Sequence, residues 1–275
     1  MRRALPWLCV VLWPTASFAV PPEGICLSAT STAAPMCEPL DREGQSFGYA
    51  WRGRLREGVL IEESTRLYWV EHYRPHRRFF GTREMADLVV RVAATVSERF
   101  PGLRLPLGEV SAPEGGLILG HRSHQSGRDV DLGFYLRDAE GAALELPAFV
   151  SVRRNGEGAF EERPVFFHDE ANWALIEALL TDPEVPVQHI FVSNGLRQRL
   201  LDHAASAGVS RDLQHRALYV LRQPGGGARP HTDHFHVRIY CSPQDRERCY
   251  DRGPYWDWTP RSHTPYWNLT VGPWQ

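Results

Sequence analysis

HRSHQSGRDVDLGF (residues 121–134) and HTDHFHVRIYC (residues 231–241) contain five of the twelve histidines of this 275-residue chain. In both stretches apolar and polar side chains alternate, which is typical of a half-buried strand whose successive side chains point to opposite faces. The apolar sets are Val130, Leu132 and Phe134 in the first stretch and Phe235, Val237 and Ile239 in the second. The sequence therefore predicts two strands that each have one apolar and one polar face.

Asp131 and His236 fall on the polar faces of these strands, which are rigid mounts for metal ligands. His124 precedes Asp131 by seven residues, across a turn at Ser126 and Gly127 that lets the backbone fold back. Two imidazoles and a carboxylate suit zinc, and three protein ligands leave a fourth tetrahedral position for water, as in catalytic sites. The pattern thus predicts a catalytic zinc site made of His124, Asp131 and His236.

Further polar residues in the two stretches have predicted roles around the metal. His234 is the expected general base, because it shares a strand face with His236. His231 is expected to stabilise the oxyanion or to assist proton transfer. His121 is either a fourth ligand or a hydrogen-bond donor behind the ligands.

Asp129 has two alternative interpretations. It either orients a ligand histidine through the second ring nitrogen, or it pairs with Arg128 or Arg238. Both Asp129 and Arg238 are therefore expected to lie just behind the metal ligands.

SHQSGRDVDLGF (residues 123–134) and HTDHFHVRIYC resemble the two motifs of the penicillin-insensitive murein endopeptidase family. That family belongs to a wider group of zinc peptidases with H-x6-D and H-x-H motifs, which includes lysostaphin-type, D-Ala-D-Ala peptidase and hedgehog-like proteins. The similarity extends more faintly from about residue 81 to residue 249. The resemblance implies one zinc ion, and the positions that match the family's metal-binding and active-site histidines and aspartate are His121, His124, Asp131, His231, His234 and His236.

The resulting hypothesis is an exported zinc metallopeptidase that hydrolyses peptide cross-links of peptidoglycan with metal-activated water. The bond between D-alanine and diaminopimelate is implied by the resemblance alone. One alternative is a D,D-carboxypeptidase or dipeptidase of the same metal group. Another is a non-catalytic cell-wall-binding module, whose closed zinc site would keep His121 permanently as the fourth ligand.

Residues 1–19 have the features of a secretory signal peptide: an arginine pair, an apolar segment and a small-x-small cleavage site ending at Ala19. Periplasmic or secreted localisation is therefore expected, with no membrane insertion after cleavage. Four cysteines then remain, and an even number in an exported chain favours disulfides. Three pairings are open, and the local pairs Cys26–Cys37 and Cys241–Cys249 are the preferred ones.

The composition excludes several functions. All 31 basic residues are arginine, so Schiff-base chemistry and serine–lysine dyads are excluded. The formal net charge is −2 and no basic stripe occurs, which argues against nucleic-acid binding. The expected partners are peptidoglycan stem peptides, and the oligomeric state is left open.

An α+β fold is expected, with a central antiparallel sheet that carries the ligands and is flanked by about three helices and long loops. The expected helices cover residues 82–100, 170–180 and 195–207, and a further buried strand covers 187–192. Residues 148–167 are expected to form a hairpin or long loop near the site, and 223–230 a hinge before His231. The predicted division is 1–19 signal peptide, 20–80 arm and start of the core, 81–249 peptidase core, and 250–275 aromatic tail.

The aromatic tail has two interpretations. Aromatic rings stack on sugars, so a glycan-binding strip is one, and packing across the domain is the preferred one. The rings concerned are Tyr255, Trp256, Trp258, Tyr266, Trp267 and Trp274.

Overall fold

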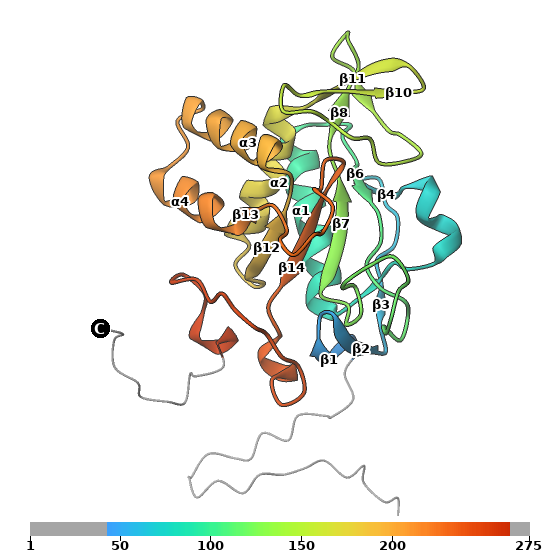
Figure 1. Cartoon of the computed structure of the whole chain (residues 1–275), viewed down its shortest axis with the longest axis vertical. Helices are drawn as coiled ribbons and strands as arrows, with labels where there is room; N and C mark the ends of the chain where they lie inside the picture. The colour runs from blue at the N-terminus through green and yellow to red at the C-terminus, as the bar shows by residue number, and fades with distance from the viewer. Residues whose placement is uncertain (1–42, 265–275) are drawn as a thin grey trace, which may run out of the picture. The chain divides into compact units, whose positions relative to one another are not determined.

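The computed structural model describes residues 43–264, in which helices and strands are mixed around one main sheet (Figure 1). The predicted signal peptide, Cys26, Cys37 and the aromatic residues from Tyr266 onward lie outside the described residues. The strands of the six-stranded main sheet, in order across it, are β13 (Leu221–Arg222), β12 (Val187–Phe191), β14 (His234–Ile239), β7 (Asp129–Gly133), β6 (Leu105–Leu107) and β4 (Leu67–Trp69).

The centre of this sheet is antiparallel and its two edges are parallel. The three central pairs, β12 with β14, β14 with β7 and β7 with β6, are antiparallel. The two edge strands pair in parallel, β13 with β12 and β4 with β6. The two strands predicted from the histidine-rich stretches are β7 and β14, and they lie side by side in the middle of the sheet. The predicted α+β class with a central antiparallel sheet is confirmed.

Four α-helices are described, one more than predicted. They are α1 (Arg83–Arg99), α2 (Asp169–Thr181), α3 (Asn194–Ser206) and α4 (Arg211–Val220). Short 3-10 helices are η1 (Glu71–His76), η2 (Pro243–Asp245) and η3 (Arg261–His263). Among the residues that the structure describes, no helix combines the length and the apolar character needed to span a membrane.

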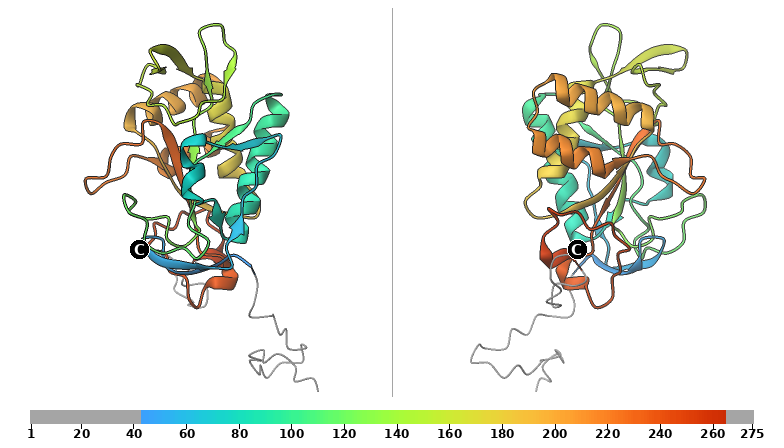
Figure 2. Two further views of the ribbon diagram at one scale, coloured as in Figure 1. Left: turned by 90° about the vertical axis from the view of Figure 1, so that its right-hand side faces the viewer. Right: turned by 60° about the vertical axis from the view of Figure 1, so that its left-hand side comes forward.

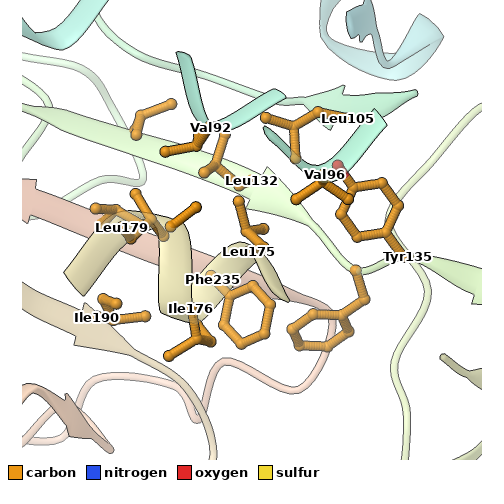
Figure 3. Packing of buried hydrophobic residues seen from close by; sticks show 14 of the residues in the cluster. Val92, Val96, Leu105, Leu132, Tyr135, Leu175, Ile176, Leu179, Ile190 and Phe235 are labelled. Carbon is orange, nitrogen blue, oxygen red and sulfur yellow. The ribbon is translucent and has the colours of Figure 1, made fainter. Parts of the chain in front are cut away.

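Helix α1 follows directly from its sequence. The side chain of Thr82 accepts a hydrogen bond from the backbone N–H of Met85 at 3.2 Å and so satisfies one of the free donors of the first turn. Val92 and Val96 recur at helical spacing and pack with Leu132 of β7 and with α2 (Figure 3). The apolar faces of β7, β14 and β12 belong to this same buried cluster, so the helices cover one face of the sheet.

Helix α2 begins one residue before the predicted limit of 170. Its N-cap is His168, whose side chain accepts from the N–H of Ala171. Asp169 is the first residue of the helix and binds the guanidinium of Arg199 on α3. The acidic side chain therefore joins two helices while it also lies at the positive end of the α2 dipole.

Three smaller sheets complete the described part of the chain. β8 and β11 lie at the centre of a four-stranded sheet that projects from one end of the main sheet (Figures 1 and 2). Its hairpin of two strands falls within the predicted 148–167 segment. The strands of the smaller sheets are β10 (Glu157–Phe160), β11 (Arg163–Phe167), β8 (Leu136–Arg137), β9 (Ala143–Leu144), β1 (Gln45–Tyr49), β2 (Arg52–Arg56), β3 (Val59–Leu60) and β5 (Phe80–Gly81).

The segment after β14 is fixed to the opposite end of the main sheet (Figure 2). The predicted disulfide between Cys241 and Cys249 is present. The backbone of Cys249 also forms an isolated parallel β-bridge with Gly48 of β1. Trp256 stacks on Trp258 and donates from its indole N–H to the carbonyl of Gln188. These two tail aromatics therefore pack across the domain.

Candidate metal centre

Strand pairing brings the two histidine-rich stretches into one site. Asp131 of β7 lies directly opposite His236 of β14, and Asp129 lies opposite Arg238. Paired residues in neighbouring strands share a face, and residues two apart in one strand do so as well. All four side chains therefore project from the face of the sheet that the helices leave free.

His124 reaches the same place from the loop before β7. Its backbone has φ 65° and that of Gly127 has φ 72°, so the chain turns back sharply between these residues. A Cβ at Gly127 would lie 2.8 Å from the backbone N of Thr82, so only glycine fits there. The Nδ1–H of His124 donates to the carbonyl of Val110 at 2.7 Å, which directs Nε2 toward the strands.

Three potential ligand atoms meet at nearly equal separations. His124 Nε2 lies 3.1 Å from His236 Nδ1 and 3.3 Å from Asp131 Oδ1, and the last two atoms are 3.1 Å apart. Ligands about 2.0–2.1 Å from a tetrahedral zinc ion would lie about 3.3–3.4 Å from one another. The three atoms are thus spaced as the vertices of one face of such a tetrahedron.

The hydrogen bonds behind these atoms determine which form each ring takes. Because His124 donates from Nδ1 and His236 donates from Nε2 to Asp129 Oδ1 at 2.8 Å, each ring turns a lone pair toward the other. Asp131 Oδ1 is buried and has no hydrogen-bond partner. Two lone pairs and a carboxylate oxygen in contact repel unless a cation lies between them. The donor set therefore fits a metal ion.

The charges of the site agree with this requirement for a cation. Burial disfavours an imidazolium at His124, but Asp131 and Asp129 outweigh that effect and raise the pKa of this ring. Burial likewise opposes ionisation of Asp131, yet His124 and His234 hold the pKa of its carboxyl well below its usual range. The aspartate is therefore a carboxylate at neutral pH.

Asp129 makes contacts of both kinds that the sequence left open. Its Oδ1 accepts from His236 and also from Arg238 Nε at 2.7 Å. Burial favours the neutral acid, but Arg238 and His236 hold the pKa of Asp129 far below its usual range. Arg128 does not pair with Asp129 and binds Asp251 instead.

His121 lies close to the other candidate ligands but is held from behind. It can offer a ring nitrogen within 4.8 Å of ligand atoms of His124 and Asp131. Its Nε2 is 2.7 Å from Glu109 Oε2, and His76 and Arg78 bind the other oxygen of that carboxylate. Burial opposes ionisation of Glu109, and these three partners lower its pKa to about 2.

His234 and His231 flank the three ligand atoms. His234 Nε2 lies 3.4 Å from Asp131 Oδ1, and its Nδ1 hydrogen-bonds Asp233 at 2.7 Å. Burial disfavours the charged ring, but Asp131 and Asp233 raise the pKa of His234 to about 10. His231 lies with its ring centroid 4.7 Å from that of His234, and burial and the neighbouring histidines lower its pKa to about 4.

A cleft of about 980 Å³ opens directly over these residues. Ser151, from the predicted 148–167 loop, and the glycine-rich 225–227 segment line it on different sides. Arg122 joins two of its walls by donating to the carbonyl of Gly226 at 2.6 Å. The candidate ligands are therefore accessible from a groove large enough for an extended peptide.

Sequence reasoning missed Glu109, Asp233 and the backbone role of residues 108–110. The N–H of Gly108 donates to the carbonyl of Asp131, and the N–H of Asp131 donates to the carbonyl of Glu109. The carbonyl of Val110 also accepts a hydrogen bond from the ring of His124. Residues 108–110 therefore hold both His124 and Asp131, the two ends of the H-x6-D motif. The position of Asp233 directly before His234 could have indicated a contact between them. In a continuous strand, however, neighbouring side chains point to opposite faces. The contact is possible because β14 begins only at His234.

The family model described as penicillin-insensitive murein endopeptidase matches residues 46–257, which include every residue of the candidate metal centre. This chain belongs to the penicillin-insensitive murein endopeptidase family.

Relatives in this family come from several Escherichia coli strains. Proteins named penicillin-insensitive murein endopeptidase from E. coli O17:K52:H18 (strain UMN026 / ExPEC) and E. coli O1:K1 / APEC are each 28% identical to this chain over 236 residues. The matched part covers 82% of this chain and 77% of each relative. The family match spans the candidate centre and all residues that line its cleft.

Proposed function

We propose that this chain is a zinc-dependent endopeptidase that hydrolyses peptide cross-links of peptidoglycan. The observation that supports it best is the convergence of His124 Nε2, Asp131 Oδ1 and His236 Nδ1 at 3.1–3.3 Å on the free face of the sheet. When bound there, zinc would supply the Lewis acidity that brings the pKa of a water molecule toward ~7 and polarises a peptide carbonyl.

Residues of the chain would hold and move the protons. His234 is the proposed general base, because Asp233 fixes its Nδ1 and leaves Nε2 directed into the site. A cation beside Asp131 would offset that carboxylate's effect on His234 and favour the neutral ring that a base requires. His231 is proposed to stabilise the developing oxyanion. His121 is proposed as a further ligand or, through Glu109, as a support for the ligand cluster.

The proposed substrate is the cross-linked stem peptide, cleaved between D-alanine and diaminopimelate. The relatives are named endopeptidases of murein, which favours an internal bond over removal of a terminal residue. Export through the signal peptide at residues 1–19 would place the enzyme in the periplasm or outside the cell. The Cys241–Cys249 disulfide is consistent with an oxidising compartment.

The test combines one variant with product analysis. His236→Ala should lose both bound zinc and cleavage of purified cross-linked muropeptides, because its lone pair is one of the converging ligand atoms. His203→Ala, on helix α3 away from the centre, is the matched control and should retain both. Mass spectrometry with and without chelator identifies the bond cleaved, and full activity of His236→Ala would refute the proposal.

A further inference from the structure

The positive and negative charges of the side chains that line the cleft do not cancel. Asp131 lies among the histidines, Asp233 bonds His234, and Arg238 is paired with Asp129. The remaining charged groups of the lining are arginines, and within residues 43–264 none of them pairs with a carboxylate. They are Arg122, Arg222 and Arg229. The part of the cleft beyond the metal centre therefore favours an anionic group of the ligand.

Strand register places one of these arginines in line with the candidate ligands. Asp131 of β7 pairs with His236 of β14, His236 pairs with Phe191 of β12, and Phe191 pairs with Arg222 of β13. The four residues form a single row across the free face of the sheet. Because neighbouring strands lie about 4.8 Å apart, the Cα of Arg222 is about 10 Å from that of His236. The sheet thus fixes the Cα of Arg222 relative to the candidate ligands.

His189 lies beside Arg222 on the same face. It precedes Phe191 by two residues in β12, pairs with Arg238, and lines the cleft. Its side chain is almost fully buried, and Nδ1 has no hydrogen-bond partner. An enclosed N–H without an acceptor is costly, so the ring proton belongs on Nε2. Burial, with Arg238 and Arg222 nearby, lowers the pKa of His189 to about 3 and keeps the ring neutral.

We propose that Arg222 and His189 form a subsite that binds a free carboxylate of the stem peptide next to the scissile bond. A guanidinium presents two parallel N–H groups that match a carboxylate, and a neutral imidazole can add one further donor. The proposal rests on the proposed function for the identity of the ligand. In a cross-linked stem, the carboxylates of diaminopimelate and of glutamate are the groups of this chemistry.

The test compares substrates that differ only in charge. Zinc-loaded mature protein is assayed on muropeptide dimers with all carboxylates free, with the diaminopimelate carboxylate amidated, or with the glutamate carboxylate amidated. The wild type should prefer the free acid over one of the amides by about 10- to 100-fold in kcat/KM, mainly through KM. In Arg222→Gln this preference should fall to about 1- to 3-fold.

Two further variants make the result specific. Arg163→Gln removes an exposed arginine on β11 and should keep the wild-type preference. His189→Phe preserves a ring between Phe191 and Trp256 and should weaken the preference without the loss of fold that a small residue would cause. A wild type that does not distinguish acid from amide, or an Arg222→Gln variant that still does, would overturn the subsite.

A binding measurement separates this proposal from the proposed activity. Calorimetric titration with an uncross-linked tetrapeptide stem, as free acid and as amides, reports the same preference without any cleavage. Preferential binding that depends on Arg222, in a protein that cleaves no dimer, would refute the endopeptidase activity and retain the subsite. Cleavage of dimers without any such preference would refute the subsite and retain the endopeptidase activity.

Discussion

At the scale of single residues, Asp129 connects the candidate ligands to the rest of the sheet. One carboxylate oxygen accepts from both His236 Nε2 and Arg238 Nε, and the side chain is fully buried. A carboxylate behind a ligand histidine fixes the ring's tautomer and raises its basicity. Asp129 therefore favours the tautomer of His236 whose Nδ1 lone pair faces the other candidate ligands.

Asp129→Asn should lower zinc affinity about 10- to 100-fold, because an amide can accept from His236 but carries no charge to strengthen the bond. Competition with a chromophoric chelator measures the affinity, and muropeptide cleavage should fall in parallel. Asp212→Asn, which removes an exposed carboxylate paired with Arg216 on α4, is the control. Wild-type zinc affinity in Asp129→Asn would show that the hydrogen bond has no influence on the metal.

Sequence patterns predicted the candidate ligands but not most of the residues that the structure places around them. His124, Asp131 and His236 were recognisable because each belongs to a short motif with strand alternation or a turn. Glu109 has no such context: it follows strand β6 and reaches His121 only through the three-dimensional fold. The alignment of Arg222 with Asp131 likewise depends on the register of four strands, which no local pattern encodes.

At the scale of secondary-structure elements, predictability followed the strength of local signals. Helix α1 combines a threonine cap with regularly spaced large apolar residues, and its predicted limits were nearly correct. Helix α4 also has a capping side chain and an apolar inner face, but both signals are weaker in its sequence. Its cap is Ser210, and its buried residues are Leu213, Ala217 and Val220. Its inner face contains a small alanine and its outer face a leucine and a tyrosine, so the apolar stripe is blurred.

An ion pair between two helices provides a pH-dependent test. Asp182, which follows α2, binds Arg91 of α1 through two hydrogen bonds of 2.8 and 2.9 Å. Burial favours the neutral acid, but Arg91 and the N–H groups of Glu184 and Val185 lower the pKa of Asp182. A lowered pKa means that the stabilisation is complete above the unfolded-state pKa of about 3.9 and disappears as the pH falls through the folded-state value.

Asp182→Asn should therefore reduce the free energy of unfolding by about 1–2 kcal/mol at neutral pH, and the difference from wild type should shrink below about pH 4. Urea unfolding of both proteins at several pH values measures this. Glu98→Gln, which removes a weak exposed pair with Arg66, should have little effect. A difference that is independent of pH would mean that the charge of Asp182 is not involved.

The disulfide after β14 stabilises an element that carries no catalytic group. Cys241 and Cys249 enclose a short loop of sequence separation 8, and this loop also pairs with β1. The chain-entropy model gives about 2–3 kcal/mol for a loop of this length. The double variant Cys241→Ser/Cys249→Ser should show that loss in chemical unfolding, and reductant should lower the stability of the wild type only. Equal sensitivity of both proteins to reductant would contradict this.

At the scale of the whole molecule, the candidate metal centre joins segments that are remote in the sequence. Residues 108–110, the loop with His124, and strands β7 and β14 meet there, and the opposite face of these strands forms the main core. Two imidazole nitrogens and a carboxylate oxygen converge there at 3.1–3.3 Å, and only the folded chain brings them together. A metal ion held by these atoms would therefore bind the folded state in preference to the unfolded one.

Metal removal should consequently lower the stability of the entire fold. A ligand that binds only the folded state stabilises it by RT ln(1 + [L]/Kd), about 2.7 kcal/mol at a hundredfold excess over Kd, or about 5–10 °C in Tm for a domain of this size. Calorimetry of the wild type with zinc and with chelator should show that decrease, whereas the Tm of His236→Ala should not respond to either. Because binding requires unprotonated imidazoles, the zinc-dependent increase should also diminish as the pH falls through the raised pKa of His124. An equal response of wild type and His236→Ala would place the stabilising metal elsewhere on the chain.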